Sequence, residues 1–287
     1  MEVPSLWKNL TITILQPVRQ QTGFRMQSSR VADRGFHISG LRQFEFGDSF
    51  RSLSRKHYAR TGEEVIIERH PEQNALVLFL LDVSGSMLVG SVRRKLDVGL
   101  DLLLHFGSAC LWKGNKIQVV AFSSRIELES DIIATTAALE LLLEELSALV
   151  PESRHTDHTE AVDQALLLSE KRRGPADLVC IVSDFLFPLS LDHFYRDVSL
   201  LQEKTDVIGL LVRDPMEEEP AGYRGRLQVR NAESGEIAWL AGIRSPDIMH
   251  EFDRHGFEAC TVSTSQGWQQ WYETLDDFFR LRRGDFH

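Results

Sequence analysis

The sequence predicts an α/β fold in which a doubly wound, mostly parallel sheet is flanked by helices. Three apolar runs, at residues 75–81, 177–184 and 206–212, have the length of a strand and lack polar–apolar alternation, which is typical of strands buried on both faces. Segments with helical periodicity separate these runs. Because strands that alternate with helices form parallel sheets, this order favours the α/β class.

The first half of the chain gives the following elements. Residues 11–15 and 64–69 are short apolar stretches that suit strands, and residues 75–81 are the first buried strand. Residues 91–112 carry apolar side chains at helical spacing and end at K-G-N, where glycine and asparagine are common helix stops. Residues 116–123 are the next strand, and we expect residues 125–128 to pair with it at the edge of the sheet.

The second half continues the alternation. Helices are expected at residues 134–149, 160–171, 191–204 and 247–255, and strands at residues 177–184, 206–212 and 258–263. Residues 215–220, P-M-E-E-E-P, are predicted to be an acidic loop, and residues 227–240 a hairpin that turns at Ser234 and Gly235. Residues 268–283 carry an aromatic stripe and are predicted to form an amphipathic helix that docks on the sheet.

Three regions are expected along the 287 residues. Residues 1–40 are predicted to be an N-terminal arm, either partly ordered or an edge extension of the sheet. Residues 41–74 contain apolar side chains and lead into the first buried strand, so we expect them to pack on that domain. Residues 75–287 are predicted to form the main α/β domain, with a hairpin near residues 222–243 and a C-terminal helix.

Composition restricts the class of protein. The net charge is −10, but residues 1–70 hold 11 Lys and Arg against 7 Asp and Glu, so the remainder is strongly acidic. An acidic body makes nucleic acid an unlikely partner. The basic N-terminal part is expected to contact the acidic body, with an acidic partner as the alternative.

Targeting features and cysteines predict a cytoplasmic protein without membrane contact. The N-terminus lacks a basic start that leads into an apolar region, and no apolar stretch approaches the roughly 18 residues of a membrane helix. Cys110, Cys180 and Cys260 are far apart among apolar neighbours, so we expect buried, reduced thiols.

A candidate metal site follows the first buried strand, in the loop D-V-S-G-S-M. Asp82, Ser84 and Ser86 come directly after the strand, and Gly85 allows a tight turn. The carboxyl ends of parallel strands are where open α/β sheets bind ligands. One carboxylate and two hydroxyls are oxygen ligands that suit Mg²⁺ or Mn²⁺. The alternative is that Asp82 caps the next helix and both serines are ordinary turn residues.

Two later positions extend this set. Thr156 lies in the polar loop R-H-T-D-H-T between two helices, and Asp184 ends the second buried strand. A strand-end Asp, S-x-S, a loop Thr and a second strand-end Asp, in this order, resemble the metal-ion-dependent adhesion site of von Willebrand factor A domains. Thr159 is the alternative to Thr156 as a ligand.

A second resemblance lies in the segment L-R-Q-F-E-F-G-D-S-F-R-S-L-S-R-K-H-Y-A-R-T-G, residues 41–62. Together with the metal loop, it resembles domain-of-unknown-function family 58, bacterial proteins with a von Willebrand factor A-like domain that are typically encoded beside MoxR-type AAA+ ATPases. The chain departs from the family pattern at Ser54-Arg55, where Asp-Trp is usual, and at His155, where Gly is usual. The positions that match in kind are Arg42, Phe44, Gly47, Asp48, Arg51, Leu53, Ala59 and Arg60.

The resemblance implies a metal-dependent protein-interaction module whose partner supplies an Asp or Glu to the cation. It implies direct ligation by Ser84, Ser86 and Thr156, and ligation by Asp82 and Asp184 directly or through water. A MoxR-type ATPase, or a client that this ATPase remodels, is the implied partner, and a role in assembly or maturation of protein complexes follows.

Three further residues are candidates for partner contact: Asp157, Arg51 and Arg60. For Asp157 the alternative is that it caps the following helix. For the basic run 51–60 the alternative is a helix whose arginines pair with the acidic body.

The competing functions are a metal-dependent hydrolase and a nucleic-acid-linked scaffold. The chain lacks G-x-S-x-G, H-E-x-x-H and G-x-x-x-x-G-K-[ST], and Ser84 stands where a haloacid-type D-x-D would place its second Asp. His155 and His158 flank Thr156 as possible bases, with solvated loop histidines as the alternative. We therefore expect a protein that is not an enzyme.

Overall fold

The computed structural model describes residues 3–16, 28–31, 37–43, 65–70, 74–153, 155–171, 175–186, 192–218, 227–230, 237–240 and 248–283. The chain divides into two compact units. The larger unit combines Met1–Ala32 with Ala75–His287, and the smaller unit is Asp33–Asn74.

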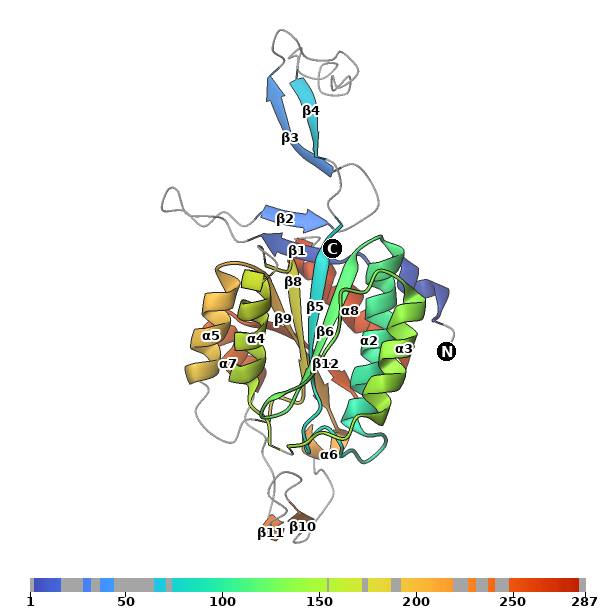
Figure 1. Cartoon of the computed structure of the whole chain (residues 1–287), viewed down its shortest axis with the longest axis vertical. Helices are drawn as coiled ribbons and strands as arrows, with labels where there is room; N and C mark the ends of the chain where they lie inside the picture. The colour runs from blue at the N-terminus through green and yellow to red at the C-terminus, as the bar shows by residue number, and fades with distance from the viewer. Residues whose placement is uncertain are drawn as a thin grey trace. The chain divides into compact units, whose positions relative to one another are not determined.

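The larger unit is built on a six-stranded sheet (Figure 1). The strand order is β12–β9–β8–β5–β6–β7, and every neighbouring pair is parallel except β6 with β7. The central strand β5 precedes its two neighbours β6 and β8 in the chain, so the sheet is wound in both directions from β5, as predicted. The strands are β5 (Leu76–Asp82), β6 (Lys116–Phe122), β7 (Ile126–Glu129), β8 (Leu178–Ser183), β9 (Asp206–Arg213) and β12 (Glu258–Ser263).

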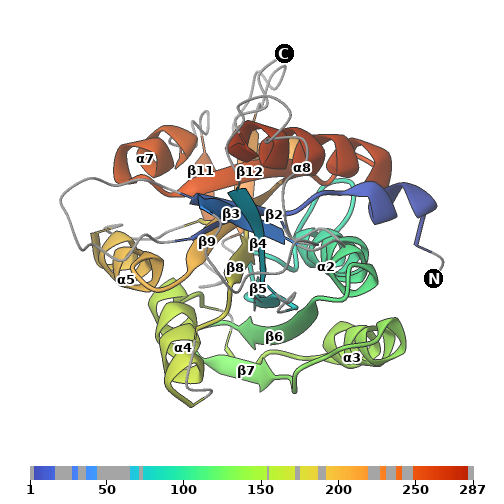
Figure 2. The ribbon, with the colours of Figure 1, turned by 90° about the horizontal axis from the view of Figure 1, so that it is seen from above.

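Helices of the described residues cover both faces of this sheet (Figure 2). One layer holds α2 (Lys95–Trp112), α3 (Thr136–Ala148) and α8 (Trp268–Arg283), and the other holds α4 (His158–Lys171), α5 (Asp192–Gln202) and α7 (Ile248–His255). Alternate side chains of β5 enter opposite cores: Phe79 packs with the first layer and Leu80 with the second. The α/β fold expected from the apolar runs is confirmed, because strands with two covered faces need apolar side chains at every position.

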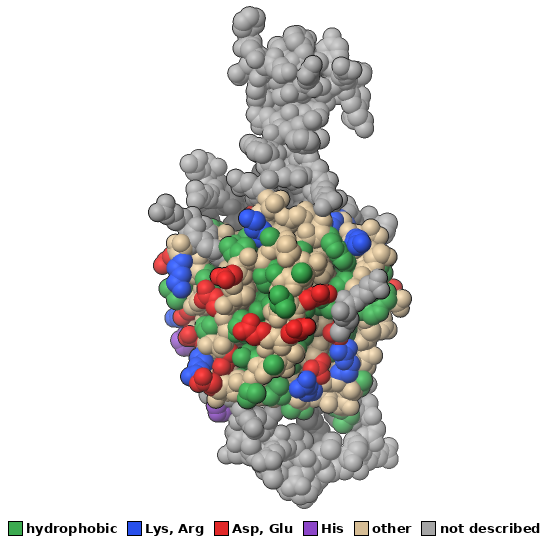
Figure 3. Space-filling view, turned by 45° about the vertical axis from the view of Figure 1, so that its right-hand side comes forward, with side chains coloured by type: hydrophobic (Ala, Val, Ile, Leu, Met, Phe, Trp, Pro, Cys, Tyr) green, Lys and Arg blue, Asp and Glu red, His purple; other side chains and the backbone are tan. Residues whose placement is uncertain are grey.

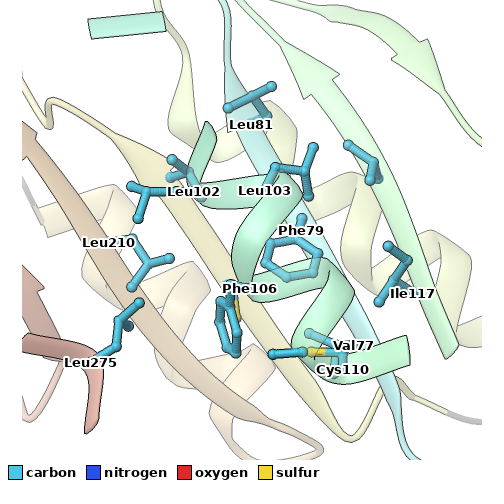
Figure 4. Packing of buried hydrophobic residues seen from close by; sticks show 14 of the residues in the cluster. Val77, Phe79, Leu81, Leu102, Leu103, Phe106, Cys110, Ile117, Leu210 and Leu275 are labelled. Carbon is cyan, nitrogen blue, oxygen red and sulfur yellow. The ribbon is translucent and has the colours of Figure 1, made fainter. Parts of the chain in front are cut away.

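In the first core, aromatic side chains of β5, α2 and α8 lie in series, and Figure 4 shows its members Phe79 and Phe106. Phe79 and Phe106 meet edge to face with ring centroids 5.4 Å apart, and Phe106 lies 5.8 Å from Phe279. The three cysteines are buried free thiols, as expected. Burial raises the pKa of Cys260 to about 12 and also raises those of the other two thiols.

The N-terminal residues belong to the same core. The 3₁₀ helix η1 (Ser5–Asn9) buries Trp7 between His105 of α2 and Tyr272 of α8, with ring centroids 5.2 and 5.7 Å away. Strand β1 (Thr13–Gln16), two residues later than predicted at its start, pairs antiparallel with β2 (Ser28–Val31). The arm therefore contributes to the main hydrophobic core.

The smaller unit contains an antiparallel pair of strands. Strand β3 (His37–Gln43) pairs with β4 (Val65–His70), and the register shifts between Ile38 and Gly40. Residues 44–64 lie outside the described residues, and Arg51 and Arg60 are among them. Packing of residues 41–74 on the main domain stays a prediction.

Two elements differ from expectation. The helix predicted from residue 91 begins at Lys95, because Ser91 bonds to Asp214 and Arg94 has extended backbone angles. The acidic loop at residues 215–220 contains a one-turn helix, α6 (Pro215–Glu218).

Other expectations agree with the described parts. Strands β10 (Leu227–Arg230) and β11 (Ile237–Leu240) form the predicted antiparallel hairpin, and its turn lies outside the described residues. Within the described ranges, none of the helices combines the length and the apolar character that crossing a bilayer requires.

Candidate functional site

The D-x-S-x-S loop leaves the carboxyl end of β5 and folds back on Asp82. The Ser84 N–H donates to Asp82 Oδ1 at 2.9 Å, and the Ser84 and Ser86 hydroxyl oxygens lie 3.2 Å apart. The following backbone turns on itself, with the Met87 N–H donating to the Ser84 carbonyl. Asp82 and Ser84 are fully buried. The loop therefore gathers one carboxylate and two hydroxyls at the sheet edge, as the sequence predicts.

Behind Asp82, a buried network holds its second oxygen. The Ser183 hydroxyl donates to Asp82 Oδ2 at 2.7 Å and accepts from the Phe185 N–H at 2.9 Å. His158 Nε2 lies 2.8 Å from the same hydroxyl oxygen. Because the Ser183 hydroxyl donates its only proton to Asp82, His158 Nε2 is the donor in the contact with Ser183. Burial lowers the pKa of His158 to about 4, so the imidazole is neutral.

The network differs from a catalytic triad, although it contains Ser, His and Asp. In a nucleophilic triad the serine donates to histidine, and the histidine donates to the carboxylate. Here the serine lies between the other two, donates to Asp82 and is fully buried. His158 stacks on Phe185 with ring centroids 5.4 Å apart. These residues thus fix the orientation of Asp82.

Asp184 places a second buried carboxylate beside the first. It follows β8, the parallel neighbour of β5, and is 1% exposed. Burial, with the charge of Asp184 as the next cause, raises the pKa of Asp82 to about 7. A cation between Asp82 and Asp184 would stabilise the two buried carboxylates in their charged form. The donor set of Asp82, Asp184, Ser84 and Ser86 therefore fits Mg²⁺ or Mn²⁺ by its chemistry.

A buried lysine, not foreseen from the sequence, touches this carboxylate. Lys95 is the first residue of α2, and its Nζ donates to Asp184 Oδ2 at 2.6 Å and to Glu217 Oε1 at 2.5 Å. The Lys95 side chain is 1% exposed. Burial opposes its charged form, but the two carboxylates outweigh burial and raise the pKa of Lys95. The ammonium is therefore a fixed positive charge beside the predicted metal site.

Glu217 and Asp214 join the lysine to α6, which begins where β9 ends (Figure 1). Asp214 Oδ1 accepts from the Met216 N–H at 3.0 Å, and Glu217 Oε2 accepts from the Asp214 N–H at 3.3 Å. These reciprocal bonds form a capping box, with Pro215 at the first helical position. Glu217 thus binds the helix start through one oxygen and Lys95 through the other.

The third predicted loop is attached to the same edge of the sheet. The Asp157 N–H donates to the carbonyl of Ser123, which follows the end of β6, and Thr156 is half-buried. Asp157 Oδ1 accepts from the Thr159 N–H at 2.9 Å, so Asp157 caps α4. The choice between Thr156 and Thr159 as ligand stays open.

Four of the five predicted ligands therefore lie on β5 and β8 or directly after them, and the loop of Thr156 joins the end of β6. In the described part of the chain, no group of three or more His, Cys, Asp or Glu side chains is arranged to hold a metal ion. The predicted site combines two Asp carboxylates with Ser and Thr hydroxyls, and Ser and Thr are not among these four residue types. Of the predicted partner contacts, Asp157 is exposed, whereas Arg51 and Arg60 lie outside the described residues.

Comparison with known proteins adds a family. Residues 40–260 match the family described as "Protein of unknown function DUF58". The chain belongs to this family. The family resemblance seen in residues 41–62 and in the D-x-S-x-S loop is thereby confirmed, and the matched range includes Asp82 and Asp184. Among curated proteins, no sequence matches the chain.

Solved structures of similar fold include the conserved hypothetical protein BatB from Bacteroides thetaiotaomicron, with a TM-score of 0.50 and 15% identity over 74% of this DUF58 chain and 100% of BatB. A von Willebrand factor type A protein from Catenulispora acidiphila matches with a TM-score of 0.43 and 11% identity, over 76% of this chain and 43% of that one. The observed strand order and helix layers make the fold of this DUF58 protein von Willebrand factor A-like.

Proposed function

We propose that this DUF58 protein is a protein-interaction module whose partner binding depends on Mg²⁺ or Mn²⁺. The observation that carries the proposal is the pair of buried carboxylates, Asp82 and Asp184, beside the Ser84 and Ser86 hydroxyls. Burial, and next the charge of Asp184, raise the pKa of Asp82, and a divalent cation would stabilise the ionised carboxylates.

In the proposed site each residue would be either a ligand of the cation or a support for a ligand. Ser84 and Ser86 would ligate the cation directly, Asp82 and Asp184 directly or through water, and Thr156 from the loop beside β6. Ser183 and His158 would hold Asp82 in place behind the cation. When bound, the cation would supply a residual positive charge that attracts an Asp or Glu of the partner.

Exposed apolar side chains around the site support a protein as the partner. Val89 and Val92 in the loop after β5, Leu186 after β8, and Met216 on α6 are each exposed. Their loops are held together by Lys95, whose N–H donates to the Val89 carbonyl and whose Nζ binds Asp184 and Glu217. Exposed apolar side chains that gather near a site fit a protein as the partner.

The family resemblance directs the choice of partner. It implies a MoxR-type AAA+ ATPase, or a client that such an ATPase remodels, and we propose this partner with a role in the assembly of protein complexes. A binding role, not catalysis, fits the only described Ser–His contact beside Asp82, since Ser183 donates to the carboxylate and is buried.

Thermal unfolding of metal-stripped protein tests the cation site. A cation at about a hundredfold excess over its Kd should raise Tm by about 5 °C, because it binds only the folded state. The double variant Ser84→Ala/Ser86→Ala should lose this increment. The matched control is Ser263→Ala/Ser265→Ala, a serine pair at the end of β12 with hydroxyls 3.0 Å apart. An equal increment in both variants would contradict the proposal.

A further inference from the structure

The Lys95 ammonium binds Asp184, a carboxylate that is also a predicted ligand of the divalent cation. Its ammonium is 2.6 Å from Asp184 Oδ2, while Asp184 Oδ1 accepts from the Leu186 N–H at 3.2 Å. Both oxygens of this predicted ligand are thus already engaged. A lysine at the first position of a helix also faces the positive end of the helix dipole, so the location itself does not favour a cation. Its two carboxylate partners compensate for this cost.

The local charges are unequal. Asp82, Asp184 and Glu217 carry three negative charges when ionised, and Lys95 supplies one positive charge. The excess of negative charge suits one divalent cation. Because Asp82, Asp184 and Lys95 are buried and Glu217 is partly buried, Coulomb interactions between them are screened less than at the surface.

We propose that Lys95 is a positioning residue that competes with the divalent cation for Asp184 and thereby sets the affinity of the site. This inference rests on the proposed function. In the absence of metal, Lys95 holds Asp184 in place. When a cation binds, Lys95 retains Glu217 as its partner, so the ammonium stays neutralised while Asp184 turns to the cation.

The test measures Mn²⁺ affinity by electron paramagnetic resonance of the free ion, on protein stripped with a chelator. Lys95→Met should bind Mn²⁺ about tenfold more tightly or better, because it removes a positive charge and frees Asp184 Oδ2. Glu217→Gln should bind Mn²⁺ more weakly, because it leaves Lys95 with Asp184 alone. A purely structural role of the Lys95–Glu217 pair predicts weaker binding in both variants.

Two further variants keep the test decisive. Lys95→Met leaves Asp184 and Glu217 without the ammonium that binds them. If this variant fails to fold, the double variant Lys95→Met/Glu217→Gln replaces it in the test. It should bind Mn²⁺ more tightly than Glu217→Gln alone. The control is Arg94→Met, which removes a neighbouring cation whose side chain is 55% exposed, and its affinity should equal that of the wild type.

The outcomes separate the two proposals. If the wild type binds Mn²⁺ and neither lysine variant binds it more tightly than its parent, the role of Lys95 is wrong and the metal site stands. If only the lysine variants bind Mn²⁺, Lys95 itself occupies the cation's place and the proposed function fails. If no variant binds, both proposals fail.

Discussion

Ser183 is the residue on which the buried network beside Asp82 depends. Its hydroxyl satisfies three groups at once: Asp82 Oδ2, the His158 ring and the Phe185 N–H. We expect Ser183→Ala to lower the free energy of unfolding by about 3 kcal/mol, because buried polar groups left without a partner cost about 1–3 kcal/mol each. Urea denaturation measures the change.

The control for this prediction is Ser265→Ala, which removes an exposed hydroxyl after β12 and should change stability by less than about 0.5 kcal/mol. If the two variants were equally stable, Ser183 would not be supporting Asp82.

At the residue scale, sequence predicts the ligands but not their neighbours. Asp82, Ser84 and Ser86 are close in the chain, so a single loop pattern reveals them. Lys95 appears in the sequence as the last residue of the basic run R-R-K, in which Arg93 and Arg94 are both partly exposed. Only the fold brings its ammonium to Asp184 and Glu217, which lie 89 and 122 positions away. The sequence alone does not distinguish this lysine from a solvated one.

At the scale of elements, Asp214 joins three segments at the carboxyl edge of the sheet. Its carboxylate accepts from the Ser91 N–H and hydroxyl, from the Met216 N–H and from the Thr264 hydroxyl. Burial would raise the pKa of Asp214, but these hydrogen bonds outweigh burial and lower it. A carboxyl with a lowered pKa in the folded state stabilises the protein above its unfolded pKa and loses this effect as the pH falls.

Asp214→Asn should therefore be destabilised by about 2 kcal/mol at pH 7, and the difference from the wild type should shrink near pH 3. Urea denaturation at both pH values tests this, with Asp163→Asn on the exposed side of α4 as the control. A difference that did not depend on pH would show that the charge of Asp214 is not what stabilises the edge.

Elements in the core were easier to predict than those at this edge. The strands follow from apolar runs, because burial on both faces leaves no other composition. The error at the start of α2 arose because Ser91 is held by Asp214, a contact between segments 123 positions apart. The one-turn helix α6 had a usable signal, since D-P-x-E is an N-cap, a proline at the first position and a capping-box glutamate.

At the scale of the whole molecule, Trp7 fastens the N-terminal residues to the main core. It is fully buried between α2 and α8. Trp7→Ala should lower the free energy of unfolding by about 3–5 kcal/mol through loss of apolar contact and a residual cavity. The neighbouring Leu6, 37% exposed, provides the control Leu6→Ala, which should lose much less. Equal losses would place Trp7 outside the core.

Removal of residues 1–70 should give insoluble protein, because it removes the buried side chains of Trp7, Leu10, Ile12 and Ile14. The solubility of the truncated protein checks this. A soluble fragment starting near residue 72 would contradict it.

The surface charge of the larger unit reflects the excess of acidic residues after residue 70. Acidic side chains lie across the face seen in Figure 3, with Lys and Arg side chains nearer its margin, and the exposed residues of α3 include Glu140, Glu144 and Glu145. The negative charge of the main domain thus includes exposed glutamates on α3. The basic run 51–60 lies outside the described residues.

The contact between β1 and α8 sets a requirement on synthesis. The Thr13 hydroxyl donates to the Phe279 carbonyl, and Arg282 donates to the Thr13 carbonyl and to Asp206. The two bonds to Thr13 join segments separated by 266 and 269 positions, so they form only after nearly the whole larger unit has been synthesised. On the ribosome, the N-terminal segment must wait until α8 has emerged before it reaches its native partners. During that interval Trp7 and its apolar neighbours lack their contacts with α8, and exposed apolar surface of this kind favours aggregation of a nascent chain.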